Sequence, residues 1–229
     1  SRYTHLISNG DVSEPRKRAS AGRDVIVYEN MKTPMASYLF FLGVGSYDSY
    51  TKDVEYPNGE KFKIELLVFP GSDKDSGERA LEVLYHCILG IYLFTGEETY
   101  KNLESKEKIY SLIKKRDELT NNPELSKVRD ELKRLVKGLK LGYKYTGSVY
   151  REIGMQNSNF GGMENVGNTA ITMNRIMPYK DMGDSGFEYM IRVKVHEYYH
   201  NINGSEVTGW SPFEIWLNVS SYINGTLTN

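Results

Sequence analysis

The sequence predicts an α/β (α+β) fold in which a mixed β-sheet comes first and helices follow. Two observations support this prediction. Runs of β-branched and aromatic residues, separated by Pro- and Gly-rich turns, lie between residues 24 and 70. From Ser76 onward, apolar residues recur at helical spacing instead. A chain of 229 residues, of which 39% are hydrophobic, is long enough to bury a sizeable core.

The first third of the chain predicts strands and then a helix. The predicted strands are DVIVYE, SYLFFLGVGSYDSY and KFKIELLVFP, at residues 24–29, 37–50 and 61–70. Asn58-Gly59 lies before the third strand and is a typical hairpin turn, because both residues tolerate positive φ. The following segment places Leu81, Leu84 and Ile88 on one helical face.

The charged segment from about residue 100 to 140 predicts an antiparallel helical hairpin that projects from the main body. Asn122-Pro123 supplies a cap and a first-turn proline for its second helix. The apolar stripe of that helix comprises Leu125, Val128, Leu132, Leu135, Val136 and Leu139. We interpret the hairpin as a solubilising insertion, which is favoured over an arm that binds a partner.

Strands return after the hairpin, and two further helices follow. GSVYREIGM and NTAITMNRIM, at residues 147–155 and 168–177, predict strands on either side of NSNFGGMENVG. A helix carrying EYMIRVKVHEYYHN should begin near Asp184 or Ser185, either of which can cap it. The last helix should start at Ser211, where S-P-F-E forms a capping box.

His196 and His200 form the core of a candidate zinc site. Four residues advance about 400° along a helix, so both imidazoles leave the same face. Glu197 is rotated by about 100° from His196, where it can reach a water molecule rather than the metal. Zinc hydrolases need this division of labour, because the glutamate takes the proton of the attacking water. A chance occurrence of His-Glu-Tyr-Tyr-His is the alternative if the motif is taken alone.

A second motif makes the resemblance to a family specific. Residues 161–165 read Gly-Gly-Met-Glu-Asn, and residues 196–200, about thirty positions later, are followed by Trp216-Leu217-Asn218. This order of motifs resembles the aminopeptidase N family of zinc aminopeptidases. The resemblance implies a thermolysin-like catalytic domain at residues 24–229 that is incomplete at its C-terminus, with a helical insertion at about 100–140. It also implies that residues 1–23 end an amino-terminal β-domain, and that the missing family domains belong to a longer parent chain.

The resemblance implies a role for each matching residue. His196 and His200 correspond to the zinc ligands, and Glu197 corresponds to the general base. The set implied for substrate binding comprises Gly161, Gly162, Met163, Glu164 and Asn165. Within it, Glu164 would hold the free α-ammonium of a peptide substrate, and the two glycines would let the backbone approach the peptide closely.

The sequence departs from the family at the third zinc ligand. The family has a glutamate directly after W-L-N, where this chain has Val219. Neither Glu206 nor Glu214 has the spacing of an evident substitute. The glutamate is either replaced or deleted, and two functions therefore remain open. One is a zinc-dependent aminopeptidase, inactive in this chain if the missing ligand is essential. The other is a non-catalytic relative that serves as a peptide-binding or scaffold module.

The cysteine content, net charge and hydropathy of the chain restrict its expected partners and location to those of a globular protein. Cys87 is the only cysteine and lies in an apolar run, which predicts a buried and inert thiol. The net charge of −1 gives no reason to expect nucleic acid or an anionic membrane as a partner. No apolar segment reaches transmembrane length, and the first residues show no signal-peptide pattern, so we expect a cytoplasmic location.

Overall fold

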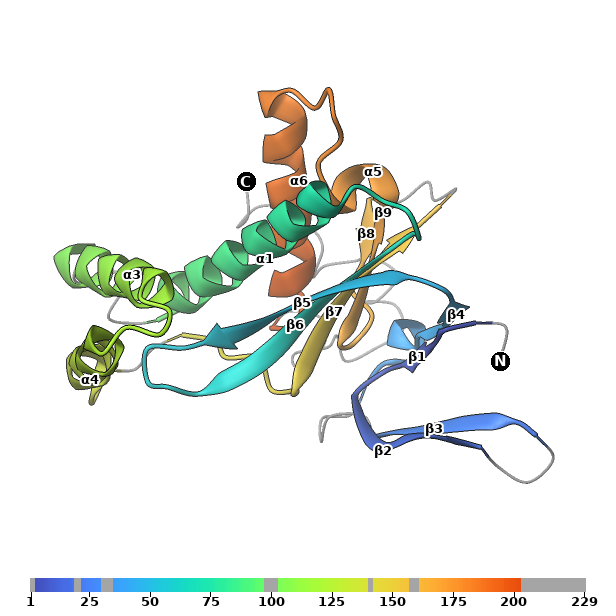
Figure 1. Ribbon diagram of the computed structural model, residues 1–229, viewed down its shortest axis with the longest axis horizontal. Helices are drawn as coiled ribbons and strands as arrows, with labels where there is room; N and C mark the ends of the chain where they lie inside the picture. Colours follow the sequence, from blue (N-terminus) through green and yellow to red (C-terminus); the bar gives the residue numbers. More distant parts are fainter. Residues whose placement is uncertain are drawn as a thin grey trace.

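A five-stranded mixed β-sheet forms the centre of the computed structural model, which describes residues 3–18, 22–29, 35–96, 103–139, 142–156 and 161–202. The strand order is β5-β6-β7-β9-β8 (Figure 1). The strands are β5 (Asp48–Glu55), β6 (Lys61–Val68), β7 (Val149–Met155), β8 (Gly162–Met163) and β9 (Asn168–Thr172). The pairs β6–β7 and β7–β9 are parallel, whereas the outer pairs β5–β6 and β8–β9 are antiparallel. The predicted mixed sheet is therefore confirmed.

The hairpin at Asn58-Gly59 sets the register of β5 against β6. Glu55 pairs with Lys61, and Gly59 has a φ of 89°. Because strand side chains alternate between faces, this register gives β6 a buried face that includes Phe62, Ile64 and Leu66.

Two long helices pack on each other beside the sheet. α1 (Lys74–Phe94) contacts β5 and β6, and α6 (Asp184–Tyr199) contacts α1 (Figure 1). Asp73 caps α1 by accepting a hydrogen bond of 2.9 Å from the backbone N–H of Ser76. Large apolar side chains from both helices and the sheet form one core. No helix in the described part of the chain combines the length and apolar character needed to cross a membrane.

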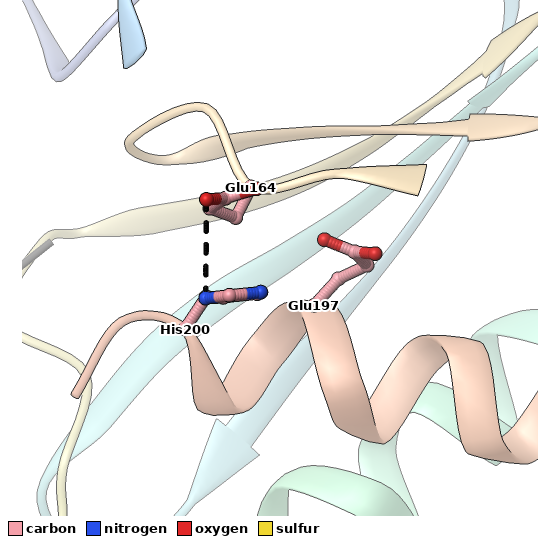
Figure 2. Close-up of side chains that lie close together, drawn as sticks. All are labelled: Glu164, Glu197 and His200. Carbon is pink, nitrogen blue, oxygen red and sulfur yellow. Dashed lines mark ion pairs between the residues drawn. The ribbon is translucent and has the colours of Figure 1, made fainter. Parts of the chain in front are cut away.

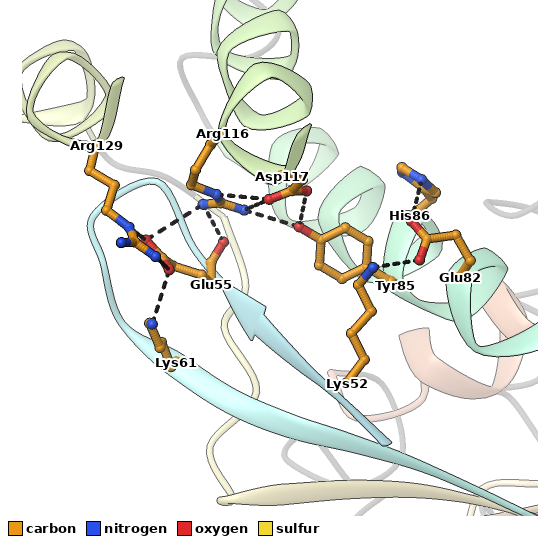
Figure 3. Close-up of polar contacts among 9 residues, drawn as sticks. All are labelled: Lys52, Glu55, Lys61, Glu82, Tyr85, His86, Arg116, Asp117 and Arg129. Carbon is orange, nitrogen blue, oxygen red and sulfur yellow. Dashed lines mark hydrogen bonds and ion pairs between the residues drawn. The ribbon is translucent and has the colours of Figure 1, made fainter. Parts of the chain in front are cut away.

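The helical hairpin consists of α3 (Leu103–Glu118) and α4 (Glu124–Val136), and it is tied to the body of the fold. Its buried residues belong to the main core; these include Ile109, Ile113, Val128, Leu132 and Val136. Polar contacts also fasten it to the end of β5 (Figure 3). Arg116 donates 2.8 Å to the carbonyl of Glu55, and Arg129 makes two hydrogen bonds of 2.8 Å to the Glu55 carboxylate. The two helices are therefore clamped to the sheet instead of projecting freely.

The N-terminal residues form two small antiparallel pairs. β1 (His5–Ser8) pairs with β4 (Leu42–Gly45), and β2 (Asp11–Arg18) pairs with β3 (Asp24–Glu29). The β2–β3 hairpin lies at the opposite end of the molecule from α3 and α4 (Figure 1). It spans the domain boundary expected at residue 23, and that boundary stays a prediction.

Three sequence-based expectations of local structure were wrong. Residues 37–39 form a 3₁₀ helix, η1 (Ser37–Leu39), rather than the start of a long strand. Residues 173–176 form the short helix α5 (Met173–Ile176), because the strand run ends at Thr172. Gly183 occupies the N-cap position of α6, and no side chain caps this end, although Asp184 lies in the first turn where its charge suits the helix dipole. The helix expected from Ser211 lies outside the described residues.

Candidate active site

α6 brings the two imidazoles together at its C-terminal end. Nε2 of His196 lies 3.2 Å from Nε2 of His200, and the ring centroids are 4.8 Å apart. Zinc–nitrogen bonds of about 2.0–2.1 Å at tetrahedral angles separate two nitrogen ligands by about 3.3 Å. The observed spacing of the two nitrogen atoms therefore suits a shared zinc ion.

His196 has the protonation state that a metal ligand needs. Burial and then the neighbouring His200 lower the pKa of His196 to about 4. Its imidazole is consequently neutral at pH 7 and keeps a lone pair for coordination.

Glu197 is a buried carboxyl group beside these rings. Its side chain is 6% exposed, and its pKa is raised to about 8 by burial, followed by the negative charges of Glu164 and Glu152. Among the described residues, no group hydrogen-bonds to its Oε2 atom. Because a buried oxygen usually has a partner, this atom marks a place where a ligand or water molecule would bind.

Gly162 provides the space that Glu197 occupies. A Cβ atom at position 162 would lie 2.6 Å from Oε1 of Glu197, whereas one at Gly161 would meet no atom closer than 3.9 Å. A side chain at position 162 would therefore force Glu197 or β8 to move. The close approach of this backbone to a peptide substrate, which the resemblance implied, stays a prediction.

Glu164 follows β8 and faces His200 (Figure 2). Its Oε1 atom lies 3.9 Å from Nδ1 of His200, and the side chain is 9% exposed. Ligand atoms of Glu164, Glu197 and His200 all lie within 4.8 Å of one another. The tertiary structure therefore brings the two motifs together in one cluster of carboxyl and imidazole groups.

The turn after Glu164 is held by backbone contacts. The N–H of Asn168 donates 2.9 Å to the carbonyl of Asn165, and Gly167 takes a φ of 72°. Asn165 is buried, and Met163 is partly buried at the end of β8. The residues predicted for substrate binding thus lie on β8 or directly beside it, and those predicted for catalysis and metal binding lie at the end of α6. Val219 and the segment around Trp216 lie outside the described residues.

Sequence reasoning missed a buried ion pair below the site. Nζ of Lys194 contacts a carboxylate oxygen of Glu152 on β7, and both side chains are 0% exposed. The signal in the sequence was a single lysine between Val193 and Val195, on the stretch of α6 that leads into His196. A cation at such an apolar position requires a buried partner.

Two imidazoles and a buried carboxyl on one helix, beside the edge of a mixed sheet, are an arrangement typical of metal-dependent hydrolases. Comparison with known proteins makes this more specific. Residues 124–224 match the family described as Peptidase family M1 domain, so this part of the chain is similar to the M1 peptidases.

A solved structure has a fold similar to that of this chain. The crystal structure of Legionella pneumophila aminopeptidase A in complex with aspartic acid superposes with a TM-score of 0.65 at 18% sequence identity. The match covers 99% of this chain and 21% of that one, so the chain spans about a fifth of the length of the matched protein. No curated protein matches the chain in a sequence search.

Proposed function

We propose that the chain carries the metal-binding and substrate-binding core of a zinc-dependent aminopeptidase, which removes the first residue of a peptide. The observation that supports this most directly is the convergence of His196, His200, Glu197 and Glu164 from two separate motifs. The M1 match over residues 124–224 supports the same class of reaction.

His196 and His200 would hold the zinc ion through their Nε2 atoms. Bound zinc lowers the pKa of a water molecule to about 7 and polarises a carbonyl group. Glu197 would accept the proton of the attacking water and deliver it to the departing amine. The positive charge of a bound zinc ion would lower the pKa of Glu197 from about 8, so that the carboxylate could accept the proton near neutral pH.

Glu164 would bind the α-ammonium group of the substrate. Its carboxylate belongs to the same cluster as Glu197 and His200, so an ammonium held there would fix the distance from the chain end to the scissile bond. Such a fixed distance explains removal of one residue at a time. The Glu164 carboxylate would make this place attractive to a cation and unfavourable to a blocked, uncharged terminus.

Metal binding and hydrolysis test the proposal together. Zinc should bind at close to one per chain by isothermal titration, and an aminoacyl-arylamide should be cleaved until a chelator is added. Glu197→Gln should retain zinc but lose about 10²–10⁴-fold in kcat, because only proton transfer is removed. An acetylated substrate should be cleaved much more slowly than the free one, and Glu164→Gln should reduce that difference.

A non-catalytic role is the second candidate, favoured by Val219 at the position where the family has its third zinc ligand. Fewer protein ligands weaken zinc binding. A folded chain that binds no zinc at neutral pH, yet still binds peptides with free amino termini, would support this role over catalysis.

A further inference from the structure

The turn that follows Glu164 has a defined backbone conformation. The N–H of Asn168 donates 2.9 Å to the carbonyl of Asn165, which closes a four-residue turn. Gly167, the third residue of this turn, has a φ of 72°. A positive φ at this position is characteristic of a type II turn, in which the central peptide is flipped relative to a type I turn. The carbonyl of Val166 belongs to that central peptide, so its direction defines the turn.

A side chain from the N-terminal part of the chain binds this carbonyl. Asn9 is 5% exposed, and its Nδ2 atom donates 2.8 Å to the carbonyl of Val166. The same amide is held by two further contacts, because Nδ2 donates 3.0 Å to the carbonyl of Leu39 and Oδ1 accepts 2.7 Å from the N–H of Phe41. A buried carbonyl that loses its donor is costly. Asn9 therefore stabilises the flipped orientation of the central peptide.

Residues near Asn9 in the sequence hold the same junction. The carbonyl of Ser8 accepts 2.7 Å from Nδ2 of Asn168, whose side chain is completely buried. The carboxylate of Asp11 accepts the N–H of Ser148, directly before β7, at 3.0 and 3.1 Å. These contacts join the N-terminal segment to the turn and to the strand that pairs with β9.

The turn in its place restrains Glu164. Glu164 directly precedes the turn, and its Oε1 atom lies 3.9 Å from Nδ1 of His200. On its other side, β8 contributes only the two residues Gly162–Met163 to the sheet. A strand this short gives little restraint of its own, so the orientation of the turn contributes to where the carboxylate lies.

We infer that Asn9 is a positioning residue for Glu164, which it holds in place through the central peptide of the following turn. This inference rests on the proposed aminopeptidase function, in which Glu164 binds the α-ammonium group. A displacement of about 1 Å in a positioning group can cost about 10²-fold in rate. His196 and Glu197 lie on α6, a separate element, so loss of Asn9 should weaken amine recognition rather than metal binding or proton transfer.

The first experiment measures the preference for a free amino terminus in wild type, Asn9→Ala and Tyr28→Phe. The preference is the kcat/KM of a leucyl-arylamide divided by that of its N-acetylated form. This ratio does not depend on the fraction of folded enzyme, so destabilisation alone leaves it unchanged. Asn9→Ala should lower the ratio roughly tenfold, through a higher KM for the free substrate. Tyr28→Phe removes a different bond of the N-terminal part, 2.9 Å to the carbonyl of Leu6, and should keep the wild-type ratio.

Gly167→Ala perturbs the same turn without changing Asn9. An alanine is strained at a φ of 72°, and its Cβ would lie 3.1 Å from the hydroxyl of Tyr145. The ratio should fall in this variant as well, while zinc binding by titration stays as in wild type in both. If circular dichroism shows that Asn9→Ala does not fold, Gly167→Ala decides, and an unchanged ratio overturns the inference. Loss of zinc together with the ratio would also overturn it, because Asn9 would then support the whole site.

The outcomes separate this inference from the proposed function. If wild type prefers the free substrate and both variants keep that preference, the inference fails and the aminopeptidase proposal stands. If wild type cleaves neither substrate, the aminopeptidase proposal fails, and titration with leucinamide and N-acetylleucinamide decides the inference. Tighter binding of leucinamide that Asn9→Ala weakens would support it. Equal or absent binding, or a preference that Asn9→Ala retains, would overturn it.

Discussion

The buried ion pair between Lys194 and Glu152 should be a major determinant of stability, and Lys194→Met is the perturbation that reveals it. Lys194 lies on α6, Glu152 lies on β7, and both side chains are inaccessible to solvent. Among the described residues, Oε1 of Glu152 has no hydrogen-bond partner. Burial raises the pKa of Glu152, and the charge of Lys194 opposes that rise. Removing the lysine would therefore leave a buried carboxyl group with nothing to neutralise it.

The size of the effect follows from this geometry. Removing one partner of a buried pair costs roughly 3–5 kcal/mol. In a chain of this size, each kcal/mol lowers the melting temperature by about 2–4 °C, so Lys194→Met should melt about 6–20 °C below wild type. Replacing both partners, as in Glu152→Leu/Lys194→Met, removes the charge without leaving it stranded, and should be about neutral or stabilising by about 1–4 kcal/mol.

Urea unfolding followed by circular dichroism, at pH 5 and pH 8, provides the assay. In Lys194→Met the folded-state pKa of Glu152 rises further above its unfolded value. The stability contribution of its protonated form is then complete below the unfolded pKa and is lost as the pH rises. The defect should accordingly be larger at pH 8 than at pH 5. A loss below about 1 kcal/mol at pH 8, or a double variant as unstable as the single one, would refute the reasoning.

Three further predictions concern single positions. Gly162→Ala should cost about 1–3 kcal/mol in urea unfolding, because its Cβ would overlap Glu197, and Gly161→Ala should be nearly neutral; equal effects would contradict this geometry. Cys87, whose pKa burial raises to about 12, should react with a thiol reagent at pH 8 only after unfolding, and rapid labelling of the folded chain would exclude its burial. Gly59→Ala should cost about 1 kcal/mol or more, because φ is 89° there, and an unchanged urea midpoint would argue against the turn.

The local pattern of apolar and turn residues was sufficient to predict much of the secondary structure. Helical spacing predicted the helix that carries His196 and His200, and Asn58-Gly59 predicted the β5–β6 hairpin. Pattern was insufficient where a segment changes conformation within an apolar run. Residues 37–41 read as strand but include η1, because Asn9 binds the carbonyl of Leu39 and the N–H of Phe41 from a distant part of the chain.

Some features of the candidate site could likewise be predicted from the sequence, and others could not. Its two motifs and the shared face of the imidazoles could be predicted, since a period of 3.6 residues fixes which side chains leave a helix together. The roles of Glu164 and Glu197 in chemistry remain predictions. The contact of Gly162 with Glu197 and the pairing of Lys194 with Glu152 could not be predicted, because each depends on how α6 lies across the sheet.

The sequence by itself determined the ingredients of this protein: two imidazoles and a carboxyl on one helix, a glycine-rich turn with a glutamate, and enough apolar surface for a mixed sheet. Only the tertiary structure decided which of these groups meet and which distant residues support them. The physical reason is the distance along the chain over which each kind of interaction acts. Spacing along a helix or strand is set by backbone geometry over a few residues, whereas contacts across tens to more than a hundred residues are selected by the packing of the whole core.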